Sequence, residues 1–304
     1  MSRIVLPEKS PLFFNDGFVF DRQRVVFASQ FAEFSGSAVS RVSQILDYLD
    51  DTAEWDYYDV QDAILSVTGT GRGDSSLAYF LGINGTVVTM GDDVEEQTIS
   101  DTERYGRLLR IRAIGDTVFA CGMSGQLLSN AGGAWRAIDA GLLGTEGLDF
   151  EDIAGTSETD VYAVGIGGIV YHFDGRVWRQ LDSPTNVSLS NVRCVSRDDV
   201  YVCGNAGTLL RGNARDGWDV LTESGIDQNF WGLEPYAGAI YVAYAGGILL
   251  HDGTDFRQVD LGLAGAADCH RLHSNDGILW SIGIDDLAYF DGDAWHRVIC
   301  PMNV

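Results

Sequence analysis

A cysteine and two histidines stand close together near the end of the chain, in the sequence Cys269-His270-Arg271-Leu272-His273. Thiolate and imidazole groups are ligands that zinc prefers, so this grouping is a candidate metal site. The surrounding residues are typical of a β-strand, in which the side chains of His270 and His273 point to opposite faces. Because the strand separates these two imidazoles, we predict no metal site here.

Paired carboxylates are the other possible source of chemistry. Lyases and glycoside hydrolases with this type of site hold two carboxyl groups roughly 5 to 10 Å apart. Asp152 and Asp268 are the best candidates, since each precedes an expected strand. The sequence contains no nucleophile elbow, no phosphate-binding loop and no His-Glu-x-x-His zinc motif. We therefore predict a protein that is not an enzyme, with no catalytic residues and no cofactor.

The elements that must position any site come from an internal repeat. One copy reads Val161-Tyr162-Ala163-Val164-Gly165, followed by a Gly-Gly turn, a second apolar run and Asp174-Gly175-x-x-Trp178. Successive copies lie about 40 residues apart, a spacing typical of repeat architectures. The residues that end the first run of each copy are Gly82, Gly122, Gly165, Gly204, Tyr244 and Gly283. A more divergent copy around Val26 to Ser29 brings the number of units to seven.

Each unit predicts short antiparallel strands. Runs of β-branched and aromatic residues alternate with Gly-Gly and Asp-Gly pairs, which suit the tight turns of β-hairpins. Another short apolar run precedes each copy and supplies an inner strand. Seven units of four strands predict an all-β, seven-bladed β-propeller that forms a single domain over residues 1–304.

Residues 39–51 interrupt the repeat in the first unit. Apolar residues follow the spacing of an amphipathic helix at Val39, Val42, Ile45, Leu46 and Leu49. Ser40 is in a position to cap such a helix. We predict a helical insertion over about residues 39–51, which either contributes to binding or covers an exposed blade edge.

A large aromatic residue recurs at the same phase of the units. The position is occupied by Trp55, Trp135, Trp178, Trp218, Phe256 and Trp295. An exposed platform that stacks on sugars is one interpretation. A position that repeats in nearly every unit fits better with packing between neighbouring blades, where a large ring buries much apolar area. We predict a core role.

The composition limits the classes of partner. The chain of 304 residues has a formal net charge of −24, and Lys9 is its one lysine. Such a charge repels nucleic acid and anionic membranes and favours a cationic protein partner, although solubility alone also explains it. No apolar run approaches the length of a membrane span or a signal sequence. With an odd number of cysteines, five, we expect reduced thiols and a cytoplasmic location.

The acidic residues concentrate in the loops that lead from one unit to the next. Aromatic residues lie among them, as in many protein-binding surfaces. The loop from Asp139 to Asp152 is the longest and the first candidate for a contact. The predicted partner-binding residues are Asp101, Glu103, Tyr105, Glu146, Asp149, Phe150, Glu151, Asp152, Asp227, Phe230, Trp231, Asp268, Asp285 and Asp286.

The unit from Asp160 to Trp178 resembles the repeats of bacterial propellers of the neuraminidase-repeat and photosystem II assembly-factor-like groups. The resemblance covers about residues 60–298 and implies the propeller fold. The sialidase Asp-box is not matched, because Asp174 and Gly175 are adjacent. Sialidase activity is therefore not implied.

The segment from Leu109 to Leu127 is similar to cytoplasmic propellers that accompany type VI secretion toxins and act as immunity proteins. This resemblance implies a non-catalytic inhibitor that occludes a cognate toxin, here through an acidic face. The protein would be a monomer or a heterodimer with its partner. A general interaction scaffold or assembly chaperone is the main alternative, and a propeller lyase or glycoside hydrolase is the least favoured.

Overall fold

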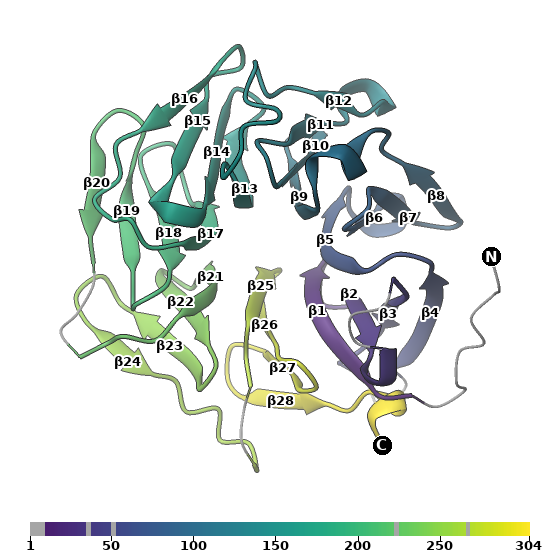
Figure 1. The fold of residues 1–304 in the computed structure, drawn as a ribbon. Helices are drawn as coiled ribbons and strands as arrows, with labels where there is room; N and C mark the ends of the chain where they lie inside the picture. The colour runs from purple at the N-terminus through teal and green to yellow at the C-terminus, as the bar shows by residue number, and fades with distance from the viewer. Residues whose placement is uncertain (1–9, 35–37, 50–52, 222–224, 266–267) are drawn as a thin grey trace.

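Seven antiparallel sheets surround a common axis like the blades of a propeller (Figure 1). The computed structural model describes residues 10–34, 38–49, 53–221, 225–265 and 268–304. Each sheet contains four strands that are consecutive in the chain, and the first strand of each sheet lies nearest the axis. The predicted all-β, seven-bladed propeller with four strands per blade is thus confirmed.

The strands of the first three blades are β1 (Leu12–Val19), β2 (Arg24–Phe31), β3 (Ser40–Leu46), β4 (Glu54–Val60), β5 (Ile64–Thr70), β6 (Leu77–Gly82), β7 (Thr86–Met90), β8 (Val94–Thr98), β9 (Leu108–Ile114), β10 (Thr117–Gly122), β11 (Leu127–Ser129) and β12 (Arg136–Ala137). Blades four and five contain β13 (Phe150–Ser157), β14 (Asp160–Gly165), β15 (Val170–Phe173), β16 (Trp178–Leu181), β17 (Leu189–Cys194), β18 (Val200–Gly204), β19 (Leu209–Asn213) and β20 (Gly217–Val220). The last two blades contain β21 (Phe230–Tyr236), β22 (Ala239–Tyr244), β23 (Gly247–His251), β24 (Phe256–Gln258), β25 (Arg271–Asn275), β26 (Ile278–Ile282), β27 (Leu287–Phe290) and β28 (Trp295–Val298). The helical turns of the described residues are short, and no helix among them is long and apolar enough to cross a membrane.

The predicted helical insertion over residues 39–51 is wrong. Ser40–Leu46 is strand β3, which pairs with β2 from Gln30↔Ser40 to Arg24↔Leu46 and with β4 along its other edge. Most of the side chains of this strand are buried, including that of Ser43. The spacing of its apolar residues therefore does not mark one buried face and one exposed face, as it would in an amphipathic helix. Residues 50–52, at the end of the predicted insertion, lie outside the described part of the chain.

The hydrophobic cores lie between blades. In one of them, Phe119 and Leu127 of blade three pack with Phe150 and Val161 of blade four. The recurring aromatic residue packs against these cores in six blades, as predicted, at Trp55, Trp135, Trp178, Trp218, Phe256 and Trp295. These rings therefore help to hold the blades to one another.

The recurring glycine has a steric cause. At Gly165 an added Cβ would collide with the backbone carbonyl oxygen of Asp149, and at Gly204 with that of Ser188. Both oxygens belong to the loop that enters the same blade. The repeat keeps glycine because this loop crosses directly against the end of the second strand.

The ring closes without a strand shared between the two ends of the chain. Sheet order follows chain order in blades one and seven, as in the others. The Phe14 N–H donates to the Ile284 carbonyl oxygen at 2.7 Å, and the side chain of Asn303 exchanges two hydrogen bonds with the backbone of Leu12. Phe27 and Trp280 pack edge to face across the same boundary, with ring centroids 5.3 Å apart. Closure therefore depends on packing and a few hydrogen bonds.

All five cysteines are free. Burial raises the pKa of the Cys121, Cys203 and Cys269 thiols, which keeps them protonated and unreactive near neutral pH. These thiols act as small apolar core groups.

Candidate partner-binding face

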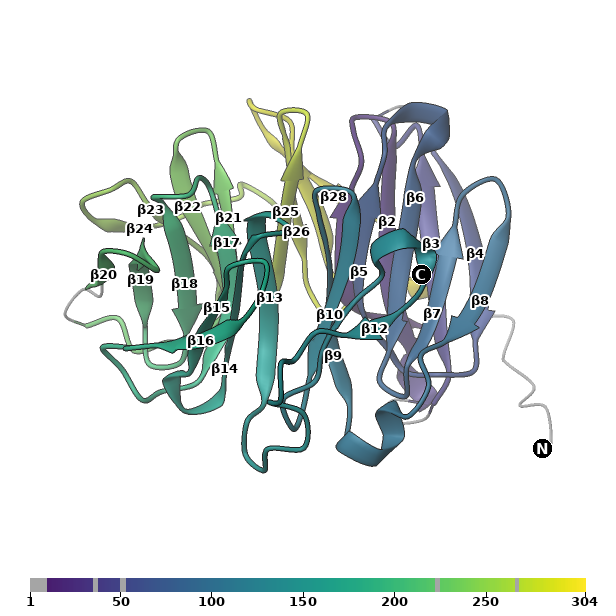
Figure 2. The same ribbon diagram turned by 90° about the horizontal axis from the view of Figure 1, so that it is seen from above.

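The loops that join one blade to the next meet the turns between second and third strands on one side of the disc, which we call the long-loop face. The largest of these loops in the described chain precede β9, β13, β17, β21 and β25. The loops before β9 and β13 project from the lower side of the disc in Figure 2. Half of the predicted partner-binding residues lie in these loops.

The loop before β13 is fixed by hydrogen bonds. The carboxylate of Asp139 accepts from the N–H groups of Gly141 at 2.8 Å and Leu143 at 3.2 Å. Two further bonds join this loop to the turn around Ser124, namely from Gly144 N–H to the Ser124 carbonyl and from Gly125 N–H to the Leu148 carbonyl. The longest loop is therefore held in one shape, which lowers the entropy cost of binding.

Three aspartates of the long-loop face hold turns of their own chain. Asp62 accepts hydrogen bonds from the backbone and side chain of Asn84. Asp149 accepts from Ser124 N–H at 2.9 Å, and Asp268 accepts from Ile284 N–H at 2.7 Å. Asp149 and Asp268 thus have structural roles in addition to the partner contact predicted for them.

Three of the predicted partner-binding side chains are inaccessible. Phe150, Asp152 and Phe230 have 0% exposure, the two aromatic rings in interblade cores and the carboxylate near the axis. Trp231 is half-buried, and its carbonyl oxygen accepts a hydrogen bond from Arg271. The first three residues cannot contact a partner unless the fold rearranges, so we exclude them from the candidate surface.

The remaining predicted residues reach the surface. Asp101, Glu103, Glu146, Asp227 and Asp285 are exposed, and the side chains of Tyr105 and Glu151 are half-buried. Asp286 forms an ion pair with Arg297, with Nε and Oδ1 2.8 Å apart. The accessible acidic residues are therefore fewer than the sequence suggested.

A groove of about 510 Å³ lies between blades two and three, at the edge of the long-loop face. We call it the blade 2–3 groove. Its walls include Asp101, Tyr105, Trp135, Arg136 and Leu143, so it joins the loops before β9 and β13. The indole Nε1 of Trp135 is buried without a hydrogen-bond partner. The groove combines an apolar wall with charges of both signs, a mixture typical of protein interfaces.

Acidic residues also gather on the opposite face. There the carboxylates of Asp174, Asp252 and Asp291 accept backbone N–H bonds within their own turns, the turn role expected of an Asp-Gly pair. Asp92 and Asp93 are exposed in the turn before β8. The distribution of acidic residues alone therefore does not identify which face binds the partner.

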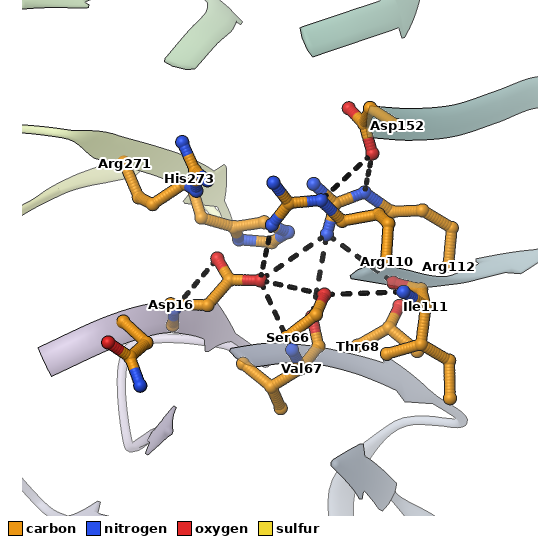
Figure 3. Close-up of polar contacts among 12 residues, drawn as sticks. Asp16, Ser66, Val67, Thr68, Arg110, Ile111, Arg112, Asp152, Arg271 and His273 are labelled. Carbon is orange, nitrogen blue, oxygen red and sulfur yellow. Dashed lines mark hydrogen bonds and ion pairs between the residues drawn. The ribbon is translucent and has the colours of Figure 1, made fainter. Parts of the chain in front are cut away.

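The axis contains a cluster of opposite charges that sequence reasoning missed. This axial cluster consists of Asp16, Arg110, Arg112, Asp152, Arg193, Glu234 and Arg271. Figure 3 shows the guanidinium groups of Arg110 and Arg112 side by side between the carboxylates of Asp16 and Asp152. Arg193 bridges Asp152, 3.3 Å from its Nη1, and Glu234, 2.9 Å from its Nε. The alternation Leu109-Arg110-Ile111-Arg112 on an inner strand was the signal that could have revealed the cluster.

Hydrogen bonds from side chains join six of the seven pairs of neighbouring inner strands around this cluster, and the ion pairs of Arg110 and Arg112 with Asp152 join β9 to β13. Acceptor side chains of one inner strand bind N–H groups of the next: Asp16 with Val67, Ser66 with Ile111, Thr68 with Ala113, Asp152 with Val192, Asn191 with Leu233, Glu234 with Ser274 and His273 with Val19. Burial opposes ionisation of Asp16, but Arg110 and Arg112 outweigh it and lower its pKa to about 2. Burial lowers the pKa of His273 to about 4, so the ring is neutral at pH 7.

The residues considered for metal binding and catalysis have other partners. His270 Nε2 lies 3.3 Å from the Asn15 carbonyl oxygen, whereas His273 Nδ1 accepts from Val19. Within the described ranges, no group of three or more His, Cys, Asp or Glu residues is placed to hold a metal ion. Asp152 belongs to the axial cluster and Asp268 binds a loop amide, so the two carboxylates considered for catalysis serve separate structural contacts.

Comparison with solved structures identifies many propellers. The WD40 propeller domain of Doa1 matches with a TM-score of 0.70 and 13% identity, over 93% of both chains. YCF48 bound to a D1 peptide matches with a TM-score of 0.68 and 14% identity, over 96% of this chain and 94% of that one. Virginiamycin B lyase from Staphylococcus aureus has a TM-score of 0.63 and 10% identity over 77% of this chain and 84% of its own. These likenesses show the fold alone.

Sequence comparison is more specific. A scan against protein-family models finds no match. The chain is 36% identical to the immune protein Tsi7 of Pseudomonas aeruginosa over 231 residues, which cover 73% of this chain and 75% of Tsi7. The chain therefore belongs to the family of the immune protein Tsi7.

Proposed function

We propose that this protein is an immunity protein that binds a cognate secreted bacterial toxin and occludes its active site. The observation that carries the proposal is the 36% identity to the immune protein Tsi7 over 231 residues. A rigid disc with preformed loops suits tight inhibition, because little conformational entropy is lost on binding. No catalytic step is needed for this activity.

We place the contact on the long-loop face, around the blade 2–3 groove. The exposed acid Asp101 lines the groove together with Trp135 and Leu143, and Glu103 and Glu146 are exposed in the loops before β9 and β13 that contribute to the groove. Buried aromatic and aliphatic anchors supply most of the affinity of protein interfaces, and rim charges mainly steer association. With a net charge of −24, the protein attracts a cationic toxin surface over long range.

A catalytic role for the axial carboxylates is disfavoured by their pairing. Asp16 and Asp152 face several arginines, which lower the pKa of both groups, so neither is suited to donate a proton near neutral pH. The propeller lyases share only the fold with this chain. We infer a binding protein that acts without catalysis.

We further propose that the protein acts in the cytoplasm against a type VI secretion toxin, as a monomer that forms a heterodimer with it. The five free thiols, four of them buried, suit a reducing compartment. No nucleic acid or membrane is expected to bind a chain of this charge.

Co-expression with the product of the adjacent gene tests the function. We expect the immunity protein to restore growth of cells that make the toxin and to co-purify with it at a one-to-one ratio. An exposed-surface variant with unchanged folding serves as the matched control. If the neighbouring product is harmless, or if several unrelated proteins co-purify at similar levels, a general interaction scaffold is the better description.

A further inference from the structure

The axial cluster has more positive than negative charge. Four guanidinium groups, from Arg110, Arg112, Arg193 and Arg271, face the three carboxylates of Asp16, Asp152 and Glu234. Arg271 has no carboxylate within 4 Å in the described part of the chain, and its Nη1 instead donates to the Trp231 and His270 carbonyl oxygens. Burial lowers the pKa of both Arg112 and Arg271 to about 10, which reflects the cost of this excess charge.

Two carboxylates of the cluster, Glu234 and Asp16, already accept several hydrogen bonds from the protein. Glu234 Oε1 accepts from the N–H and hydroxyl of Ser274, and its Oε2 accepts from Arg193 Nε. Asp16 Oδ2 accepts from Ser66, Val67 and Arg110. These oxygens are occupied by groups of the protein, whereas Asp152 Oδ1 has no hydrogen bond of good geometry from the residues that the structure describes and lies 3.3 Å from Arg110 Nε and 3.4 Å from Arg112 Nε.

The donors, in contrast, are in surplus. Arg112 Nη2 and Arg271 Nε are buried without a hydrogen-bond partner among the described residues, and Arg112 Nε has only its ion-pair contact with Asp152 Oδ1 at 3.4 Å. A buried donor without an acceptor costs about 1–3 kcal/mol, and more when it is charged. The two donors left without a partner and the excess of one positive charge favour an added anionic acceptor.

A cavity of about 200 Å³ lies beside Arg112, lined by residues from all seven inner strands. Its walls include Arg112, Arg193, His273 and Thr68. His273 Nδ1 accepts from Val19, so the neutral ring carries its proton on Nε2 as a donor. Thr68 Oγ1 accepts from Ala113 N–H, and its hydroxyl proton remains free to point elsewhere. The cavity is therefore rich in donors from several elements.

We propose that this axial cavity binds one small oxyanion of the size and charge of inorganic phosphate, held by the guanidinium groups of Arg112 and Arg193. Planar guanidinium groups match oxyanions with paired N–H donors. The lining residues stand toward the ends of the inner strands that lead into β-hairpin turns, away from the long-loop face. The anion would therefore join blades around the axis and leave the proposed toxin contact free.

Titration of the intact protein with phosphate tests this site, with chloride at equal ionic strength as the reference. We expect a saturable rise in the melting temperature with phosphate and a one-to-one stoichiometry by calorimetry. Measurements in about 0.15 M salt keep the long-range repulsion from the acidic surface screened. Equal effects of phosphate and chloride would overturn the proposal.

Two substitutions separate binding from folding. Glu234→Gln removes the negative charge from the cavity wall, and it should raise phosphate affinity severalfold even if the variant is less stable. Arg112→Met should abolish the phosphate response, whereas Arg215→Met, at an exposed site outside the cavity, should leave it unchanged. Unchanged phosphate affinity in the Glu234→Gln variant would contradict the assigned site.

Discussion

His273 Nδ1 accepts a hydrogen bond from the backbone N–H of Val19 at 3.1 Å, and this bond joins the inner strand of the last blade to that of the first. Only the neutral imidazole can accept it. Burial holds the pKa of His273 and of His270 down to about 4, from an ordinary value of 6.5. We therefore expect the stability of ring closure to depend on pH.

Stability should fall as the pH decreases from about 6.5 to about 4. In this range the unfolded chain binds protons at His270 and His273 while the folded protein does not, so acid favours unfolding. Asp16, whose pKa is about 2, stays ionised in the folded state over this window. Urea denaturation at pH 7.5, 5.5 and 4.5 checks this, with His273→Gln as the variant that should flatten the dependence. A midpoint that does not change over this range would refute the coupling.

Asp152→Asn should destabilise the protein by about 3–5 kcal/mol, because it leaves buried guanidinium groups without their counter-charge. Arg110, Arg112 and Arg193 all lie within 3.4 Å of the Asp152 carboxylate. Asp182→Asn is the matched control, since Asp182 is exposed, and should change stability by less than about 0.5 kcal/mol. Thermal and urea unfolding measure both variants. Similar effects of the two substitutions would show that the axial pairs contribute little.

Charge reversal beside the blade 2–3 groove should weaken toxin binding and leave stability nearly unchanged. The double variant Asp101→Arg and Glu146→Arg changes two exposed acids on the long-loop face. The matched control is Asp92→Arg with Asp93→Arg, which alters the same charge on the opposite face. Calorimetry at low and high salt should show a larger loss of affinity for the first pair, most marked at low salt, where charges are least screened. Equal losses of affinity in both double variants would mean that the net charge of the protein, and not a particular surface, determines toxin binding.

Asn303→Ala should destabilise ring closure by roughly 1–3 kcal/mol, because it removes two hydrogen bonds to the backbone of Leu12. Hydrogen exchange of β1 and β25 should accelerate more than that of blades three to five. Asn229→Ala provides a comparison at a site where the amide side chain binds a local loop. Uniform acceleration across all blades would instead indicate a loss of global stability.

The fold could be predicted because its signals repeat. The apolar runs, the glycine that avoids a passing carbonyl at Gly165 and the aromatic residue at Trp178 recur in successive blades. The segment Ser40–Leu46 misled because both faces of β3 are buried, so its apolar spacing matched a helix by coincidence. In the structure this segment forms strand β3, which pairs with β2 along one edge and with β4 along the other.

The candidate site was harder to predict than the fold. Asp152 and Asp101 both fall near loops that enter a blade, yet one is fully buried among arginines and the other is exposed. That difference depends on which inner strands meet at the axis, a relationship between residues about 40 positions or more apart. Sequence position alone could not reveal it.

Because every sheet is built from one continuous stretch of chain, no blade depends on a strand borrowed from the far end. The hydrogen bonds between Leu12 and Asn303 place residues near the two ends of the described chain side by side. A circular permutant that links these ends and opens the chain between any two blades would keep all seven sheets whole. The seven blades could thus keep the same order around the disc even if the polypeptide began at a different blade.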